Sequence, residues 1–181
     1  MSEIGGTPRS AAPKLQASNH FRMTAMTSFR LVGLPAEPFE HFFEMSPAEL
    51  EAAGARRMLA VAPNSAPCRV SLVDAEVGEE LLLLPWEHQP AASPYRASGP
   101  IFVRRHARQA ELARGAMPPY VTRRLMSVRA YDVADMMIDA AVCEGPAATD
   151  TITRLFADEA VAYIHLHNAK RGCFSCRVER A

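Results

Sequence analysis

Four consecutive leucines at positions 81–84 constrain the fold more than any other feature of this chain of 181 residues. Successive side chains of a strand point to opposite faces, so an unbroken apolar run needs a cover on both faces. We therefore predict a central strand over residues 79–84. Further segments have the alternation or composition of strands, and they lie at residues 29–34, 56–62, 68–73, 100–105, 124–131, 136–143, 161–167 and 173–179.

Helical patterns are fewer and shorter than the strand patterns. Ser46, Pro47 and Glu49 together form the signature of a capped helix start, and Gly54 supplies a stop. Apolar residues spaced three and four positions apart predict an amphipathic helix over residues 147–157. Two more short helices are expected at residues 39–43 and 107–117. The sum predicts an α+β fold, with a mostly antiparallel sheet of about seven or eight strands and three or four short helices packed on it.

The charges of the chain balance, since Lys and Arg total 20 and Asp and Glu also total 20. A duplex-binding surface leaves a basic excess, so this balance argues against nucleic acid as a partner. No apolar run approaches the roughly 18 residues of a membrane span, which argues against a membrane protein. Residues 1–27 show neither periodicity nor the apolar core of a signal peptide. We expect them to form a disordered tail on a cytoplasmic protein, followed by a single α+β domain over residues 28–181.

The last two predicted strands form a hairpin in which chemistry-bearing side chains gather. Because strand side chains alternate, one face of this hairpin should be apolar and the other polar. We expect the buried face to contain Ile164, Leu166, Phe174, Cys176 and Val178. The opposite face should then bring together, near the turn, His165, His167, Cys173 and Arg177.

This alternation also bears on the pair of cysteines at positions 173 and 176. Residues three apart in a strand point to opposite faces, whereas a metal or redox pair needs both sulfur atoms to converge. We therefore predict that Cys176 is a small buried side chain. Cys173 remains the candidate for chemistry.

A second candidate region is the proline-rich stretch over residues 85–100. A segment of this length without regular structure is unusual in a compact domain, and such loops are often functional. We predict one small-molecule site where this loop meets the hairpin at residues 163–173. Its lining would comprise Glu87, His88, Tyr95, Arg96, His165, His167, Asn168 and Cys173. The alternative is a structural loop in which Trp86 plugs the sheet.

Three chemistries fit such a site, and the first is a metal centre. A His-x-His pair on one strand presents two imidazoles on the same face, here His165 and His167. Glu87 or His88 could supply a further ligand. The sequence specifies neither the metal nor any cofactor.

The second chemistry is that of a nucleophilic thiol. Cys173 would attack, and His167 would act as its base across the hairpin. The neighbouring cations of the turn, Lys170 and Arg171, would favour the thiolate form of the sulfur.

The third hypothesis is a non-catalytic pocket for a small anionic molecule. Arginine side chains would hold the anion, and aromatic rings would pack on it. The residues concerned are Arg69, Arg96, Arg177, Trp86 and Tyr95. In a purely structural alternative, the histidines and cysteines only complete the packing of the hairpin. The oligomeric state is left open by the sequence.

Four strings of the sequence together resemble a bacterial family called domain of unknown function 1203. They are GLPAEPF from residue 33, PCRVSLVDAEVGEELLLL at 67–84, EHQPAASPYRASGPIFVR at 87–104 and VAYIHLHNAKRGC at 161–173. The resemblance runs from about Phe29 to Arg180. It implies a single domain in a bacterial cytoplasm, and it carries no assigned reaction.

Overall fold

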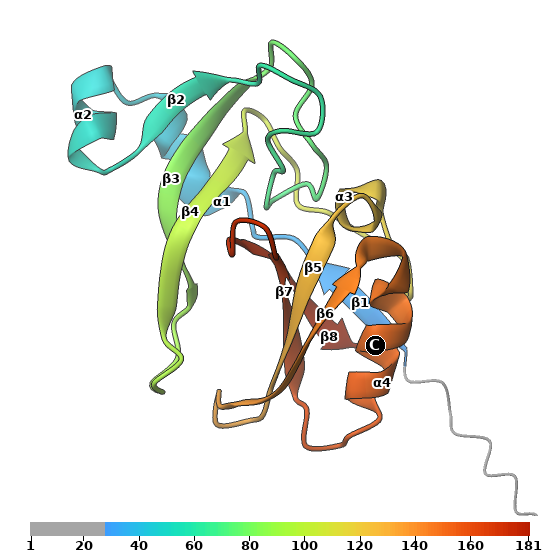
Figure 1. Ribbon diagram of the computed structural model, residues 1–181. Coiled ribbons are helices and arrows are strands. Elements are labelled where there is room, and N and C mark those ends of the chain that lie inside the picture. Colours follow the sequence, from blue (N-terminus) through green and yellow to red (C-terminus); the bar gives the residue numbers. More distant parts are fainter. Residues whose placement is uncertain (1–27) are drawn as a thin grey trace, which may run out of the picture.

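The chain forms two antiparallel sheets, and the computed structural model describes residues 28–181 (Figure 1). The disordered tail predicted over residues 1–27 lies outside the described residues. Within the described part, eight strands and four short α-helices confirm the predicted α+β class. The strands are divided between a five-stranded and a three-stranded sheet.

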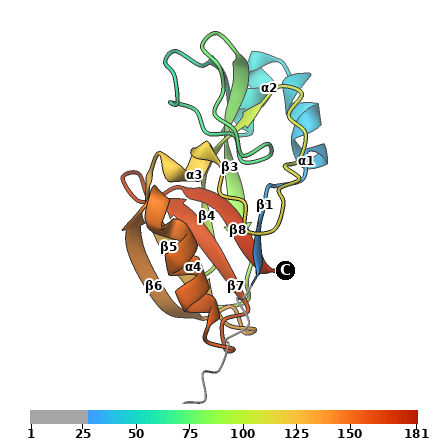
Figure 2. The same ribbon diagram turned by 90° about the vertical axis from the view of Figure 1, so that its right-hand side faces the viewer.

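The five-stranded sheet has the order β1-β8-β7-β5-β6. Its strands are β1 (Phe29–Val32), β8 (Phe174–Arg180), β7 (Tyr163–Asn168), β5 (Leu125–Tyr131) and β6 (Met137–Glu144). Helix α4 (Ala148–Phe156) lies across one face of this sheet (Figure 2). The core between the helix and the sheet includes Ile152, Leu155, Ile164, Leu166 and Val178.

The three-stranded sheet has the order β2-β3-β4, and its strands are β2 (Arg56–Leu59), β3 (Glu80–Gln89) and β4 (Ala97–Arg104). The leucine run lies in β3, which confirms its central position. Leu82 and Leu84 pack against the helical layer, whereas Leu81 is buried on the opposite face. That layer comprises α1 (Glu37–Glu40), the 3₁₀ turn η1 (His41–Phe43) and α2 (Pro47–Ala52), and α2 begins with the predicted capping box. The remaining short elements are α3 (Pro119–Thr122) and the 3₁₀ turn η2 (Gly145–Ala147).

The prediction that residues 85–100 form an irregular loop is wrong. Strand β3 continues to Gln89 and β4 begins at Ala97, so only residues 90–96 connect them. Strand β2 pairs with β3 no further than Leu83, and beyond it β3 and β4 continue as a two-stranded arm. Pro85 lies opposite Pro100 at the start of this arm. Proline is tolerated in strands whose N–H side has no partner, which explains how a proline-rich segment forms a ladder.

Two other predicted elements, the strand at residues 68–73 and the helix at residues 107–117, do not form in the part of the chain that the structure describes. The segment 68–73 is a buried turn in which Leu72 has a φ of 50°, and residues 107–117 form coil with a turn at Arg114 and Gly115. Both segments use their backbone groups in long-range contacts instead of in regular elements. The Ala110 N–H donates to the Val70 carbonyl at 2.9 Å, and the Arg69 N–H donates to the Phe102 carbonyl at 3.0 Å. Apolar alternation at Cys68 and Val70 therefore reflects burial without a strand.

Gly33 allows the chain to close around this buried turn. The Leu34 N–H donates to the Arg69 carbonyl at 2.8 Å, and a Cβ at Gly33 would overlap with the Val70 carbonyl oxygen. The Gly33 carbonyl in turn accepts from the Gln109 side chain at 2.8 Å. The position of the Arg69 segment is thus fixed from both sides by backbone contacts.

Candidate functional site

The predicted site residues do not line one site but lie in three places. His88, His165 and His167 meet between the two sheets. Glu87, Tyr95 and Arg96 lie at the end of the β3–β4 arm. Asn168 and Cys173 lie at the turn between β7 and β8, where Cys173 contacts both Asn168 and Arg69.

The three histidines cluster between the arm and the five-stranded sheet, where His165 and His167 are buried and His88 is partly buried. The ring centroid of His88 lies 5.2 Å from that of His167 and 6.3 Å from that of His165. Phe174 stacks on His88 at 5.0 Å. Only 2 % of His165 and 1 % of His167 is exposed. The arm therefore covers the polar face of β7, and this face is not an open surface.

Phe174 lies on the histidine face, contrary to the prediction that it belongs to the apolar face. Leu166 pairs with Cys176 and His167 pairs with Phe174, so β8 contains one extra residue, Ser175, at this point. Such a bulge reverses the alternation on one side of it. Cys176 lies beyond the bulge, in the core under α4. As predicted it is a small buried side chain, and burial raises its pKa to about 12.

Burial keeps the histidine cluster neutral. Desolvation lowers the pKa of His165 to about 2 and that of His167 to about 4, and it also lowers the pKa of His88. The Nδ1 of His167 lies 3.0 Å from the Gly172 carbonyl oxygen, so it is the nitrogen that carries the proton. The other nitrogen of His167 and the Nδ1 atoms of His88 and His165 are buried with no hydrogen-bond partner among residues 28–181.

No group of three or more His, Cys, Asp or Glu side chains within residues 28–181 is placed so that it could hold a metal ion. The histidine cluster instead joins the two sheets. A neighbouring pair of hydrogen bonds acts in the same way, because Gln89 Nε2 donates to the Tyr163 hydroxyl at 2.6 Å, and that hydroxyl donates to Asp135 at 2.7 Å. Sequence patterns gave no signal for these two contacts.

Glu87 and Arg96 form an exposed ion pair on the arm, with 2.5 Å between Oε1 and Nε. Tyr95 packs edge-on against Tyr131, with 6.2 Å between the ring centroids. Arg177, a member of the predicted anion clamp, lies instead over the Tyr163 ring at 3.8 Å. Trp86 packs on Phe39, so it does not face a site with Tyr95. The predicted anion clamp therefore does not form, because its other four members have partners elsewhere and do not lie with Arg69.

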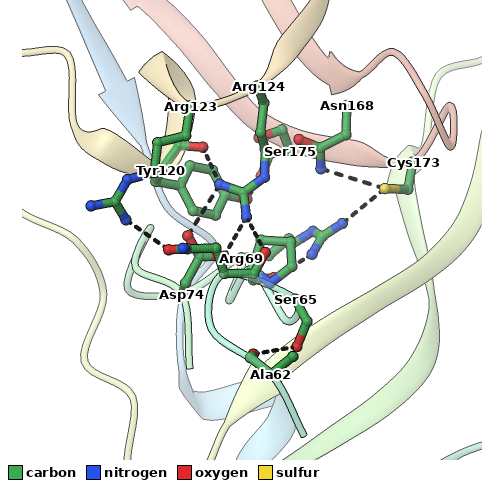
Figure 3. Close-up of polar contacts among 12 residues, drawn as sticks. Ala62, Ser65, Arg69, Asp74, Tyr120, Arg123, Arg124, Asn168, Cys173 and Ser175 are labelled. Carbon is green, nitrogen blue, oxygen red and sulfur yellow. Dashed lines mark hydrogen bonds and ion pairs between the residues drawn. The ribbon is translucent and has the colours of Figure 1, made fainter. Parts of the chain in front are cut away.

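Cys173 lies beside two nitrogen donors (Figure 3). Its Sγ accepts from Arg69 Nη2 at 3.1 Å and from Asn168 Nδ2 at 3.4 Å. The hydrogen bond from Cys173 to His167 that the thiol hypothesis requires is absent within residues 28–181, where His167 binds the Gly172 carbonyl. Arg69, instead of the predicted His167, lies next to the sulfur of Cys173.

Arg69 is almost completely buried, with 1 % of its surface exposed. Its Nε donates to the Phe174 carbonyl at 2.8 Å, and its Nη1 donates to the Pro67 carbonyl. A guanidinium carries five N–H groups, so these two contacts and the one to Cys173 leave two N–H groups for another acceptor. Among residues 28–181, no carboxylate forms an ion pair with Arg69.

Arg124, which lines the same pocket as Arg69, is a largely buried arginine whose charge has a partner, Asp74 (Figure 3). Both oxygens of the Asp74 carboxylate accept from it, so its charge is neutralised. Arg124 also donates to the Tyr120 carbonyl. Arg69 is therefore more deeply buried than Arg124 and yet lacks, within the described part of the chain, the carboxylate partner that Arg124 has.

A pocket of about 410 Å³ opens between the three-stranded sheet and the β7–β8 turn. We call it the Arg69 pocket. No Asp or Glu of the described chain lines it, whereas five cationic side chains do, namely Arg69, Arg123, Arg124, Lys170 and Arg171. Its apolar wall is formed by Met58, Leu59, Val61, Leu81, Phe102 and Leu125. Asn168 and Cys173 also line it, and they are the two predicted site residues that it contains. The one sequence signal for its centre is an arginine inside the apolar stretch Cys68–Val70.

The fold and the pocket define a two-sheet α+β protein with a basic cavity between its sheets. The chain belongs to the family described as protein of unknown function DUF1203, whose family model matches residues 65–180. The matched region contains the Arg69 pocket apart from the lining residues between 58 and 64, together with the histidine cluster. No curated protein and no solved structure is detectably similar to the chain. Within the described residues, no helix is both long and apolar enough to cross a membrane.

Proposed function

We propose that this chain is a cytoplasmic small-molecule-binding protein whose Arg69 pocket holds a small organic anion. The observation that carries the proposal is the buried guanidinium of Arg69, which has no carboxylate partner among residues 28–181. An unpaired buried charge costs several kcal/mol, and an opposite charge in the same low-dielectric site offsets that cost. An anion in the pocket would supply this charge and accept the two remaining N–H groups of Arg69.

The remaining charges of the pocket support the same ligand. Lys170 and Arg171 are exposed at the turn, and neither forms an ion pair within residues 28–181. Cations around an opening raise the local concentration of anions and speed their association. The histidine cluster contributes nothing to this field, since desolvation lowers the pKa of each of its histidines and keeps it neutral.

Thermal unfolding in the presence of benzoate, acetate or inorganic phosphate tests this proposal, with sodium chloride at the same ionic strength as the reference. We expect at least one anion to raise the unfolding midpoint by about 5–10 °C at a hundredfold excess over its Kd. The shift should disappear in Arg69→Met and shrink in the double variant Lys170→Gln/Arg171→Gln. Arg96→Gln is the matched control, because Arg96 is an exposed arginine on the arm.

Two results would overturn the anion-binding proposal. The first is that none of the anions stabilises the protein more than chloride does. The second is that the midpoint of Arg69→Met rises as much as that of the wild type. The double variant keeps the test decisive if Arg69→Met does not fold, because its two substituted side chains are exposed.

A second candidate function is thiol chemistry at Cys173, which lines the Arg69 pocket and whose sulfur lies beside two N–H donors. A cysteine in a basic pocket should react faster with an anionic electrophile than with a neutral one of the same shape, because the surrounding cations attract the anion. Iodoacetate and iodoacetamide form such a pair. In both reactions a sulfur–carbon bond forms and iodide leaves.

We expect the ratio of the iodoacetate rate to the iodoacetamide rate to be about threefold or more higher at Cys173 than at Cys143. Cys143 is a partly buried cysteine on β6 and serves as the internal control. Peptide mass spectrometry of the quenched protein measures both sites in one sample. Equal ratios at the two cysteines, or a ratio at Cys173 that Lys170→Gln/Arg171→Gln leaves unchanged, would exclude this thiol function.

A further inference from the structure

The Arg69 pocket is chemically divided, and its two halves specify the ligand more closely than charge alone. We infer that the ligand is an amphipathic organic anion, with one anionic group bound at Arg69 and an apolar body lying along β2–β4. This inference rests on the proposed function and names the ligand class of the same site. The anionic group would be a carboxylate or a singly charged equivalent, because both fit the planar fork of a guanidinium.

The apolar half of the pocket includes unusually exposed side chains. Met58 and Leu59 are 40 % and 59 % exposed on the edge strand β2, and Val61 is exposed beyond it. All three line the pocket, where they continue the buried surface of Leu81. Exposed apolar side chains that adjoin a cavity mark a surface that a ligand covers.

The anionic and apolar halves adjoin each other at the base of the pocket. The Phe102 ring lies on β4 with its centroid 6.0 Å from Cζ of Arg69, and both residues line the cavity. A ligand whose charged group is attached directly to its apolar body can therefore contact both. The volume of about 410 Å³ lies at the small end of the range for small-molecule pockets, which is about 300–1,000 Å³.

The polar end of the pocket also contains a hydrogen-bond acceptor without a partner among residues 28–181. Asn168 is 8 % exposed, its Nδ2 donates to Cys173, and its Oδ1 is buried without a partner among residues 28–181. A buried acceptor of this kind costs free energy until a donor meets it. A hydroxyl or amide N–H next to the anionic group of the ligand would satisfy Asn168 Oδ1 while the anion satisfies Arg69.

Isothermal titration calorimetry with four probes tests the ligand class. The probes are 4-tert-butylbenzoate, its neutral amide 4-tert-butylbenzamide, acetate and inorganic phosphate. We expect 4-tert-butylbenzoate to bind with a Kd at least tenfold below those of the other three. The amide lacks the charge, whereas acetate and phosphate lack the apolar body.

A matched pair of surface variants tests where the apolar body lies. Leu59→Ser should raise the Kd of 4-tert-butylbenzoate about threefold to tenfold, because it removes apolar contact area from the pocket wall. Val142→Ser is the control, since Val142 is 65 % exposed on another edge strand, β6, and does not line the pocket. Equal effects of the two variants would contradict the proposed orientation of the ligand.

The outcomes of the titration separate this inference from the proposed function. If acetate or phosphate binds as tightly as 4-tert-butylbenzoate, the pocket binds anions but the amphipathic class is wrong. If the amide binds as tightly as the benzoate, charge plays no part and both proposals fail. If none of the four probes binds, the proposed function fails and the inference fails with it.

Discussion

Acidification from pH 7.5 to pH 4.5 should strongly destabilise this protein. The cause is the histidine cluster between the sheets, where burial lowers the pKa of His165 to about 2 and that of His167 to about 4. In the unfolded chain both side chains would titrate near their ordinary pKa of about 6.5. The unfolded state therefore binds more protons than the folded state at acidic pH, and this favours unfolding.

The direction of this effect on stability, and the pH range in which it occurs, follow from these pKa values. A lowered folded-state pKa leaves the full stability in place above about pH 6.5 and removes it as the pH falls. The contribution of His167 should be lost between about pH 6.5 and pH 4, and that of His165 should continue to fall toward pH 2. At pH 4.5 the lowered pKa of each histidine should reduce the free energy of unfolding by about 2–3 kcal/mol. Together they amount to about 5 kcal/mol, a large share of the total stability of a typical domain, which is about 5–15 kcal/mol.

Urea denaturation at half-unit steps from pH 7.5 to pH 4.5 measures this loss. His165→Phe keeps a ring among Tyr131, Tyr163 and Phe174 but cannot take up a proton. It should flatten the dependence of the unfolding free energy on pH. His41→Gln, at an exposed histidine, is the matched control. A wild-type stability that stays constant down to pH 4.5 would show that the cluster is hydrated or already protonated in the folded state.

The second large effect is expected at Asp74, which neutralises Arg124. The side chains of Asp74 and Arg124 are 8 % and 15 % exposed, so their ion pair is largely buried. Removing one partner of a buried pair leaves an unpaired charge and costs about 3–5 kcal/mol. We expect Asp74→Asn to lower the unfolding free energy by about 3 kcal/mol, because the amide keeps the shape of the side chain but loses its charge.

The exposed pair of Glu87 and Arg96 provides the comparison for this effect. Its side chains are 37 % and 63 % exposed. Exposed pairs contribute about 0–1 kcal/mol, so Glu87→Gln should change the stability by less than about 1 kcal/mol. Urea denaturation at pH 7.5 measures both variants. Equal losses in the two would mean that burial does not govern the strength of these pairs.

The sequence predicted the strands better than the connections between them. The leucine run in β3 and the alternation in β7 reflect burial on known faces, and a period of two residues is visible in any strand of sufficient length. The extra residue at Ser175 was not visible, because no residue type marks a bulge of this kind. It nevertheless moved Phe174 to the histidine face. The turn at residues 68–73 was mistaken for a strand because buried coil and strand share the same apolar alternation.

The candidate site could be predicted only in part. His88 does meet the two histidines of β7, as the sequence suggested, but the meeting place is buried between the sheets. Arg69 and Cys173 lie 104 residues apart in the chain, and no local pattern indicates that they touch. Their contact depends on how the turn at residues 68–73 packs against β8, which is a property of the whole fold.

The arm formed by β3 and β4 has a consequence for the Arg69 pocket. One wall of the pocket belongs to the three-stranded sheet, and the opposite wall includes the β7–β8 turn of the other sheet. The aperture of the pocket is therefore set by the angle between the sheets, and the contacts of the arm with β7 hold that angle. A ligand that contacts both walls therefore restrains the same angle between the sheets that the histidine cluster restrains. By thermodynamic linkage, protonation that loosens the arm weakens ligand binding, and a bound ligand protects the arm against acid to the same extent.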